Sequence, residues 1–375
     1  MNFRLLWITE NYFPSRGGMA QSCDRIVHGL RARGVQVDVV HFTTRHKPYQ
    51  WQPQQGGNYL ACPIEDSGAH TLNRLWTYLQ SQQQEYTHMV AFGGHLPLMA
   101  ASVFPVWMDI PLITLFRGND LDAAIFSARR QGILLRVLEL SQAVGAVSRD
   151  KVNRIRRLCP RVKVFFTPNG IDTDQWTLSR SDHEHAYAWK KENAGGRKVI
   201  GFFGHLKSKK GVPFLLEAME QSRVDAQVHL LMVGHLEDRL QDILLNHSRF
   251  SHSCLPFMDR YELLGYYPAC DAIAIPSFYD GMPNVMLEAG SLGIPLIASR
   301  TDGMKDLLAE ENRAWLFNPG DLADASRTVK AWADALPGEL AQRTRRCQQH
   351  IRQYYNQEQE TANYLEILTK TLRPT

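Results

Sequence analysis

The stretch "DAIAIPSFYDGMPNVMLEAGSLGIPLIAS", residues 271–299, joins an apolar run, a glycine turn, a helical pattern and a second apolar run. The first run ends at Ser277, and Pro283 favours a helix that begins near it, because proline is tolerated in the first helical turn. Two short apolar runs separated by a helix are typical of a strand–helix–strand unit with parallel strands. The stretch therefore predicts one unit of a parallel sheet.

The same alternation runs through the rest of the chain, from "FRLLWIT" (3–9) onward, and is interrupted once. Residues 173–197 are polar, lack a strand-like run and end in a glycine pair, as a linker with a short helix would. We therefore predict an α/β protein with two doubly wound, Rossmann-like domains, residues 1–172 and 198–355. Ligands bind at the carboxyl ends of the strands in such sheets, so we expect one shared cleft.

Length and composition fit a folded protein with two domains. The chain has 375 residues, of which 44% are hydrophobic and 21% charged, and it contains no apolar run long enough to span a bilayer. The N-terminus predicts a buried first strand instead of a secretory signal, so a cytoplasmic location is expected. Six scattered cysteines predict neither a disulfide framework nor a zinc site, and a net charge of +4 requires no nucleic acid partner.

The turn before the predicted helix has the features of an anion site. Backbone N–H groups of Gly281 to Val285 and the helix dipole would favour a phosphate at the helix N-terminus. Asp280 lies in the loop, and Glu288 lies about one turn into the helix, where a carboxylate can accept hydrogen bonds from a diol. A turn acid and a helix salt bridge are the plainer interpretation of each acid alone, but the spacing favours a ligand site.

A second candidate is the loop in "GFFGHLKSKKGVPFLLEAM", residues 201–219. It follows a strand, carries Lys207, Lys209 and Lys210, and opens into a helix, so its lysines can neutralise a diphosphate. The P-loop pattern is absent, and Lys207 and Lys209 are equally consistent with solvated surface lysines. Neither half carries Gly-x-Gly-x-x-Gly after its first strand, which disfavours a dinucleotide cofactor.

Three weaker signals complete the set. The glycine pair Gly17 and Gly18 precedes a predicted helix and lets the backbone approach a ligand, although a tight turn explains it equally well. Arg117 and Asp120, in "TLFRGNDLD", follow a predicted strand at its ligand-facing end. The turn in "TPNGID" (167–172) is best interpreted as structural.

Together and in this order, the segments resemble the retaining glycosyltransferases of family 4, which have the GT-B fold of two Rossmann-like domains facing each other across a cleft. The resemblance extends from the glycine pair to "GSLGIPLIAS" (290–299). The family has two glutamates with seven residues between them, the first contacting the hydroxyls of the transferred sugar and the second the ribose of the nucleotide. Here the pair is Asp280 and Glu288, so the first acid is one methylene shorter.

Two further positions depart from the family pattern. His205 stands where an arginine normally meets the diphosphate, while Lys210 matches the family's lysine. Arg117 stands where a histidine often contacts the donor sugar, and it could supply the charge that His205 lacks; unchanged chemistry in a subfamily is the alternative. The resemblance also implies that residues 1–172 form the acceptor-side domain and residues 198–355 the domain that binds the nucleotide sugar. The last helix, residues 356–375, is expected to return to the N-terminal domain.

The resemblance implies transfer of a sugar from a UDP- or GDP-sugar to an acceptor hydroxyl with retention, and no cofactor. The departing phosphate oxygen would deprotonate the acceptor, and the lack of an Asp-x-Asp motif predicts that no metal is needed. The expected catalytic residues are Asp280, Lys210 and Arg117. The expected donor-binding residues are Gly17, Gly18, His205, Gly281, Met282, Pro283, Asn284, Val285 and Glu288.

Two other functions stay open at this stage: a nucleotide-sugar epimerase of similar architecture, and a sensor that binds the sugar nucleotide without turning it over. Neither the donor base nor the acceptor, lipid-linked or saccharide, can be chosen from the sequence. "RDKVNRIRRLCPRVK" (149–163) holds seven basic residues against one acid. It is consistent with peripheral contact at the inner face of a membrane, but such a run is more often a solvated helix face.

Overall fold

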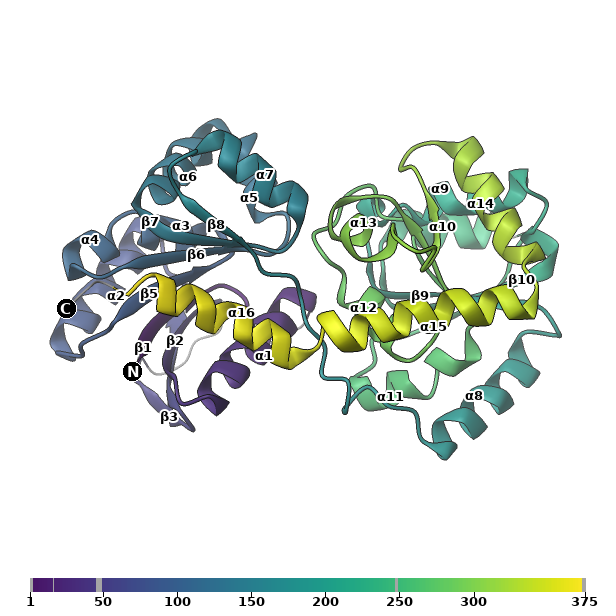
Figure 1. Cartoon of the computed structure of the whole chain (residues 1–375), viewed down its shortest axis with the longest axis horizontal. Helices are drawn as coiled ribbons and strands as arrows, with labels where there is room; N and C mark the ends of the chain where they lie inside the picture. Colours follow the sequence, from purple (N-terminus) through teal and green to yellow (C-terminus); the bar gives the residue numbers. More distant parts are fainter. Residues whose placement is uncertain (1–2, 16, 45–48, 247–248, 373–375) are drawn as a thin grey trace. The chain divides into compact units, whose positions relative to one another are not determined.

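We describe a computed structural model of residues 3–15, 17–44, 49–246 and 249–372. The chain forms two compact units, each with its own α/β core. Unit 1 comprises residues 1–169 and 357–375, and unit 2 comprises residues 170–356. Both contain parallel sheets with helices on their faces (Figure 1), so the predicted doubly wound α/β architecture is confirmed.

The sheet of unit 1 is parallel except for the antiparallel pairing of its edge strand β3 with β4. Its strands in spatial order are β3 (Gln52–Gln54), β4 (Gly57–Pro63), β2 (Gln36–Thr43), β1 (Arg4–Thr9), β5 (His88–Phe92), β6 (Leu112–Phe116), β7 (Ser141–Ala146) and β8 (Lys163–Phe166). The central strands are apolar on both faces because both faces are covered by helices, as expected for a buried parallel sheet, whereas the edge strand β3 is polar and exposed.

Alternate residues of β1 supply the two cores of unit 1, since successive strand side chains point to opposite faces. Leu5 and Trp7 pack with α1 and α16, whereas Leu6 and Ile8 pack with α2, α3, α6 and α7. The helices are α1 (Gly18–Ala32), α2 (Gly68–Ser81), α3 (His95–Ala101), α4 (Phe104–Met108), α5 (Asp120–Ile125), α6 (Ala128–Leu140), α7 (Arg149–Leu158) and α16 (Gln357–Lys370).

The sheet of unit 2 is parallel throughout the described residues. Its strands in spatial order are β11 (Ser251–Leu255), β10 (Val228–Leu236), β9 (Lys198–Leu206), β12 (Ala272–Ile275), β13 (Leu296–Ser299) and β14 (Trp315–Phe317). The core on one face joins β9 and β10 to α9, α10 and α14. Helix α12 packs against α15.

The helical elements of unit 2 are α8 (Arg180–Asn193), η1 (Ser208–Lys210), α9 (Val212–Gln221), η2 (Asp225–Gln227), α10 (Asp238–Asn246), α11 (Arg260–Leu264), η3 (Tyr267–Ala269), α12 (Asn284–Ser291), α13 (Asp302–Leu308), α14 (Leu322–Asp334) and α15 (Pro337–Tyr354). Helix α12 begins one residue after Pro283, as predicted.

The predicted linker, residues 173–197, is part of unit 2 and has a packed helix. Ser179 and Asp182 form a capping box at the start of α8, and Lys190 makes a 2.6 Å ion pair with Asp271. The ring of Trp189 lies edge-on to Tyr266. The chain crosses between the units at residues 169–170 and 356–357, so the polar composition of this segment reflects a surface helix.

Each sheet has one topological switch point. In unit 1 the chain moves from β1 outward through β2, then returns to β5 on the other side of β1. In unit 2 it moves from β9 through β10 and β11, then returns to β12 on the other side of β9. Ligands bind outside the carboxyl ends of the strands at such points, so a binding site is expected at each of these two edges.

Candidate active site

The switch point of unit 2 is occupied by the segment that opens α12. Pro283 is the N-cap residue and has no side-chain oxygen that could cap the first turn. Met282 and Pro283 are buried, while Asn284 and Val285 are partly exposed. The carbonyl of Gly281 accepts a 2.7 Å hydrogen bond from the N–H of Gly303 in α13, which holds the turn in place. The partial positive charge of the helix N-terminus is therefore held at this edge of the sheet.

Lys210 and Asp280 meet beside this helix. The Lys210 Nζ lies 2.5 Å from Asp280 Oδ2, although the residues are 70 positions apart. The lysine side chain is 25% exposed and the aspartate side chain 17% exposed, so both remain within reach of a ligand. The structure thus brings together two of the residues expected to act in the reaction.

The lysine loop is tied to the segment after β12 by its backbone. Gly211 has a positive φ of 65°, and a Cβ at this position would lie 2.2 Å from the carbonyl oxygen of Pro276, so the close approach requires glycine. The N–H of Phe278 donates to the carbonyl of Lys209 at 3.0 Å. Glu237 accepts hydrogen bonds from both the N–H and the hydroxyl of Ser208, at 2.7 and 2.6 Å. Lys210 is therefore presented by a loop with fixed geometry.

Glu288 is 7% exposed, and its Oε2 accepts a 2.6 Å hydrogen bond from the hydroxyl of Tyr267. Burial, followed by the neighbouring carboxylate, raises the pKa of Tyr267 well above its ordinary value, so the phenol stays a donor. Tyr267 lies in η3, 21 positions before Glu288, and no sequence motif marks it as part of the site. Tyr267 therefore orients the Glu288 carboxylate from inside the protein, and only a small part of the Glu288 side chain is open to a ligand.

His205 lies near the end of β9 with its side chain exposed, and its ring centroid is 4.7 Å from that of His235 on β10. The pKa of His205 is lowered mainly by partial burial, and further by the charge of Lys207 and by His235. The imidazole is therefore neutral near pH 7. The repeated Gly-His-Leu at 204–206 and 234–236, whose members pair in register across the two strands, is a sequence signal that would have revealed His235.

A cavity of about 450 Å³ opens at the carboxyl ends of β10 and β11. Its lining combines apolar groups, including Leu244 and Pro256, with the imidazoles of His235 and His252. Along the sheet edge, the order is this cavity, the histidine pair, the lysine loop and the start of α12. The arrangement offers an apolar compartment, the lysine loop and the carboxylates of Asp280 and Glu288 along a single edge.

Arg117 does not join this set. Its guanidinium side chain is 1% exposed and donates to the carbonyl of Thr167 at 2.5 Å, to the hydroxyl of Tyr364 at 2.6 Å and to the side chain of Asn169. Glu360 lies 3.4 Å away. The predicted contact between Arg117 and a donor sugar is therefore not available in this structure, because the guanidinium already holds α16 to the sheet of unit 1.

The sequence matches family models over both units. The model described as "Glycosyltransferase Family 4" matches residues 16–175, and that described as "Glycosyl transferases group 1" matches residues 197–334. The chain belongs to the GT-B glycosyltransferases of the family 4 type.

Relatives of this glycosyltransferase cover most of its length. An uncharacterized glycosyltransferase of Methanocaldococcus jannaschii is 25% identical over 360 residues, which cover 88% of this chain and 90% of the relative. A GDP-mannose-dependent alpha-mannosyltransferase of Corynebacterium glutamicum is 22% identical, with 88% of this chain and 80% of the relative covered. The epimerase and sensor alternatives receive no support from these relatives.

Solved structures share the fold. Sucrose-phosphate synthase from Thermosynechococcus elongatus superimposes with a TM-score of 0.83 at 16% identity, covering 98% of both chains. The Anabaena protein HepE in complex with UDP-glucose gives a TM-score of 0.78 at 17% identity, covering 97% of this chain and 99% of the other. At this level of identity the likeness establishes the GT-B fold of the glycosyltransferase.

The remaining predicted positions of the glycosyltransferase lie in unit 1. Gly17 is the N-cap of α1 and, like Gly18, is exposed, so neither is buried against the fold. Two residues of the basic run 149–163 form ion pairs within the protein. Lys151, whose side chain is 1% exposed, and Arg154 both pair with Asp122.

Two classes of feature are missing from the described part of the glycosyltransferase. No described helix is both long and apolar enough to cross a membrane. Nor do three or more His, Cys, Asp or Glu side chains gather in a metal-binding arrangement anywhere in residues 3–15, 17–44, 49–246 and 249–372.

Proposed function

We propose that this glycosyltransferase transfers a sugar from a nucleoside diphosphate sugar to an acceptor hydroxyl, with retention of configuration at the anomeric carbon. The observation that carries the proposal is the ion pair of Lys210 and Asp280 beside the N-terminus of α12. A cation and a helix N-terminus favour a diphosphate, and the adjacent carboxylate favours hydroxyl groups. A nucleoside diphosphate sugar carries both kinds of group side by side.

Each group of such a donor can be assigned to a feature along this sheet edge. The apolar cavity beside His235 takes the base, and Glu288 accepts hydrogen bonds from the ribose hydroxyls. The amides of Gly281 to Val285 and the ammonium of Lys210 take the diphosphate, while Asp280 binds hydroxyls of the sugar. A carboxylate that is fixed by Tyr267 loses little conformational entropy when a diol binds, which favours this role for Glu288.

The reaction needs one bond to break and one to form. The bond between the anomeric carbon and the diphosphate oxygen breaks, and the acceptor oxygen bonds to the same carbon on the same face. The acceptor proton passes to the departing phosphate oxygen, as the resemblance to family 4 implies. Lys210 and the start of α12 stabilise the charge that develops on the diphosphate, an effect of preorganised charge that is often the largest contribution to catalysis.

The donor is a UDP- or GDP-sugar. The relatives include a mannosyltransferase named for GDP-mannose, and a structural neighbour binds UDP-glucose, which supports the donor class without choosing its base. We propose further that no divalent metal is required, because Lys210 and the helix N-terminus already oppose the diphosphate charge. Activity that persists in excess EDTA, and is not increased by Mg²⁺ or Mn²⁺, is the expected result.

A donor screen tests the function. Purified protein is mixed with UDP-glucose, UDP-galactose, UDP-N-acetylglucosamine, GDP-mannose and GDP-fucose, and both the Tm and the release of nucleoside diphosphate are measured with and without a panel of sugar and polyol acceptors. We expect one carrier base to raise the Tm and an acceptor to increase the release of nucleoside diphosphate. ¹H NMR of the product then reports the anomeric configuration. An inverted product would contradict retention, and donor interconversion without an acceptor would contradict transfer.

A further inference from the structure

A second polar cavity lies in unit 1, at the switch point of its own sheet. It has a volume of about 180 Å³ and is lined by residues that follow β1, β5 and β6: Glu10, the pair Gly94 and His95, and Asp120. Three strands that are neighbours in the sheet thus each contribute a side chain or turn to one cavity. In an open α/β sheet this is the position at which a ligand is expected.

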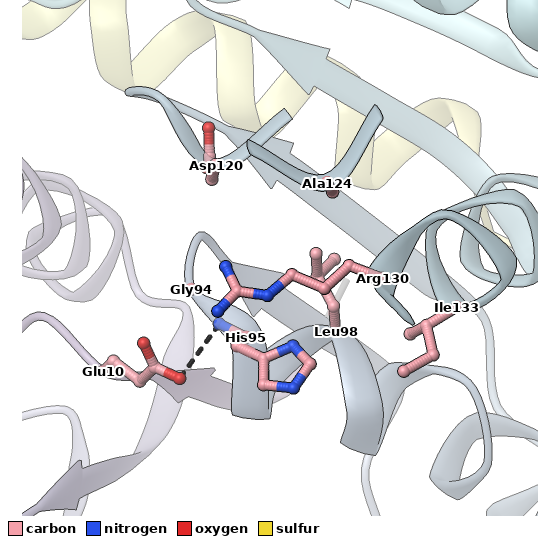
Figure 2. A pocket seen from close by; sticks show the side chains of 8 residues that line it. All are labelled: Glu10, Gly94, His95, Leu98, Asp120, Ala124, Arg130 and Ile133. Carbon is pink, nitrogen blue, oxygen red and sulfur yellow. Dashed lines mark hydrogen bonds between the residues drawn. The ribbon is translucent and has the colours of Figure 1, made fainter. Parts of the chain in front are cut away.

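Two carboxylates of the cavity are oriented by backbone N–H groups. Glu10 Oε1 accepts a 2.9 Å hydrogen bond from the N–H group of His95 (Figure 2) and a 2.6 Å hydrogen bond from that of Leu96. Asp120 accepts from the N–H groups of Arg117, Gly118 and Leu121 at 3.0 to 3.2 Å. Their negative charge is therefore partly balanced by the backbone, and their orientation is fixed before any ligand binds.

Gly94 keeps the space beside Glu10 open. Its φ is +83°, and a Cβ at this position would lie 2.6 Å from Glu10 Oε2. Any larger residue would be strained in this backbone conformation and would also collide with the carboxylate. Glycine at position 94 therefore allows both the turn after β5 and the observed position of the Glu10 carboxylate.

Arg130 is the cation of the cavity. It lies on α6, it is exposed, and no ion pair or side-chain hydrogen bond of its guanidinium occurs among the residues that the structure describes. Figure 2 shows its side chain extended across the cavity above His95, toward the side on which Glu10 lies. The pKa of His95 is lowered by burial first and then by the charge of Arg130, so its imidazole is neutral near pH 7. Arg130 is therefore the cationic group at the cavity that has no anion of its own.

The opposite wall is apolar. Leu98, Ala124 and Ile133 line it (Figure 2). A sugar ring or cyclic polyol has hydroxyls at its rim and C–H groups on its faces, so it suits a cavity with carboxylates on one side and aliphatic groups on the other. The volume of about 180 Å³ is below that of pockets for larger ligands, so the cavity suits one small ring and not a complete sugar nucleotide.

We propose that this cavity is the acceptor subsite and that it binds a single sugar or polyol ring carrying an anionic group, a phosphate or a carboxylate, which pairs with Arg130. The inference rests on the proposed function and adds the chemical class of the acceptor. Glu10 and His95 receive the ring hydroxyls, and the aliphatic wall contacts the ring face.

Methyl NMR of the full-length protein tests the proposal without knowledge of the natural acceptor. The protein is labelled at Ile, Leu and Ala methyl groups and titrated with glucose, glucuronate and glucose 6-phosphate. We expect shifts of the Ile133, Leu98 and Ala124 methyl signals, with at least one charged sugar binding about tenfold or more tightly than glucose at low salt. The glucuronate and glucose 6-phosphate arms distinguish a carboxylate site from a phosphate site.

Two arginine variants separate a specific contact from general electrostatics. Arg129 is the preceding residue on α6, is also exposed and does not line the cavity, so Arg129→Ala removes the same charge from nearly the same place. Arg130→Ala should abolish the preference for charged sugars, and Arg129→Ala should preserve it. Equal binding of charged and neutral sugars, equal effects of the two variants, or no shift of these methyl signals at millimolar probe would overturn the proposal.

The same samples keep this inference distinguishable from the proposed function. Titration with UDP and GDP should shift the methyl signal of Ile275, the last residue of β12 in unit 2. A response at Ile275 without a response at Ile133 would overturn the acceptor proposal alone. The reverse result would contradict the donor site and leave the charged-sugar site of unit 1 standing.

Discussion

Arg117 and Tyr364 are 247 positions apart, yet Nη1 of the arginine donates to the tyrosine hydroxyl at 2.6 Å inside unit 1. The same guanidinium contacts Asn169, the last residue of unit 1 before the chain crosses to unit 2. Glu360 of α16, which accepts from Arg25 at 2.6 Å, lies within 3.4 Å. Arg117 therefore stabilises both the returning helix and the residue next to the crossing point.

Replacing Arg117 tests this structural role. Arg117→Met should lower the stability of unit 1 by about 3–5 kcal/mol, because it leaves buried partners of the arginine unpaired. At 2–4 °C per kcal/mol, the fall in Tm is about 10 °C. Nucleoside diphosphate affinity, measured by calorimetry below the Tm, should change little. Loss of donor affinity with an unchanged Tm would instead support a donor contact, and Arg129→Ala serves as the exposed control.

Replacing Lys210 should affect activity and not stability, the opposite of what we expect for Arg117. Its ion pair with Asp280 is partly exposed, and such pairs contribute less than about 1 kcal/mol to stability. Lys210→Met should therefore leave the Tm nearly unchanged but lower kcat by about 100- to 1,000-fold, the loss seen when one preorganised electrostatic group is removed. Lys207→Met, in the same loop, should retain most activity. Equal losses in both variants would mean that the loop acts only through its net charge.

The proposed contact between Glu288 and the ribose can be tested with a nucleotide that lacks the ribose hydroxyls. The affinity of a nucleoside diphosphate is compared with that of its 2′,3′-dideoxy analogue in the native protein and in Glu288→Gln. The native protein should prefer the ribose form by about tenfold or more, because hydrogen bonds to a charged acceptor contribute about 1.5–3 kcal/mol. Glutamine can still accept from Tyr267, so the variant should fold and lose most of that preference. A preference that survives the substitution would place the ribose elsewhere.

The buried His88 should make the stability of unit 1 fall as the pH is lowered. Burial lowers its pKa to about 4 from an ordinary value near 6.5, and its imidazole contacts Thr371 just after α16. Since the folded-state pKa is depressed, the unfolded state binds a proton first as pH falls below about 6.5. Stability is therefore lost between about pH 6.5 and 4, by at most about 3 kcal/mol.

The comparison with His88→Gln isolates this contribution from that of the other histidines. Chemical unfolding at pH 7.5, 5.5 and 4.5 should show a smaller loss of stability in the variant than in the native protein. Parallel pH profiles would show that His88 is not responsible.

The sequence was sufficient for the features that depend on local pattern. The apolar runs marked the strands, and Pro283 marked the start of α12 to within one residue. Lys210 and Asp280 were identified separately, because each follows a strand in a loop that opens a helix, and the sheet brings them together. Parallel neighbours have their carboxyl ends at one edge, so this convergence follows from the topology.

Features that depend on distant packing were not predictable in the same way. The burial of Arg117 depends on α16, which supplies Tyr364 and Glu360 from the far end of the chain. Tyr267 lies in a short 3₁₀ turn with no sequence signature. The cavity of unit 1 draws on Glu10, His95 and Arg130, which belong to no common motif. Asp120 is the lining residue that the sequence places at the ligand-facing end of a strand, and Glu10 and His95 also follow strand-like runs closely.

A crystal structure with whichever of UDP or GDP raises the Tm would show the donor site directly. We expect phosphate oxygens within hydrogen-bond distance of amides between Gly281 and Val285 and of Lys210 Nζ, with a ribose hydroxyl on Glu288. A nucleotide bound with its phosphates away from the start of α12, or with its ribose out of reach of Glu288, would contradict the proposed donor site.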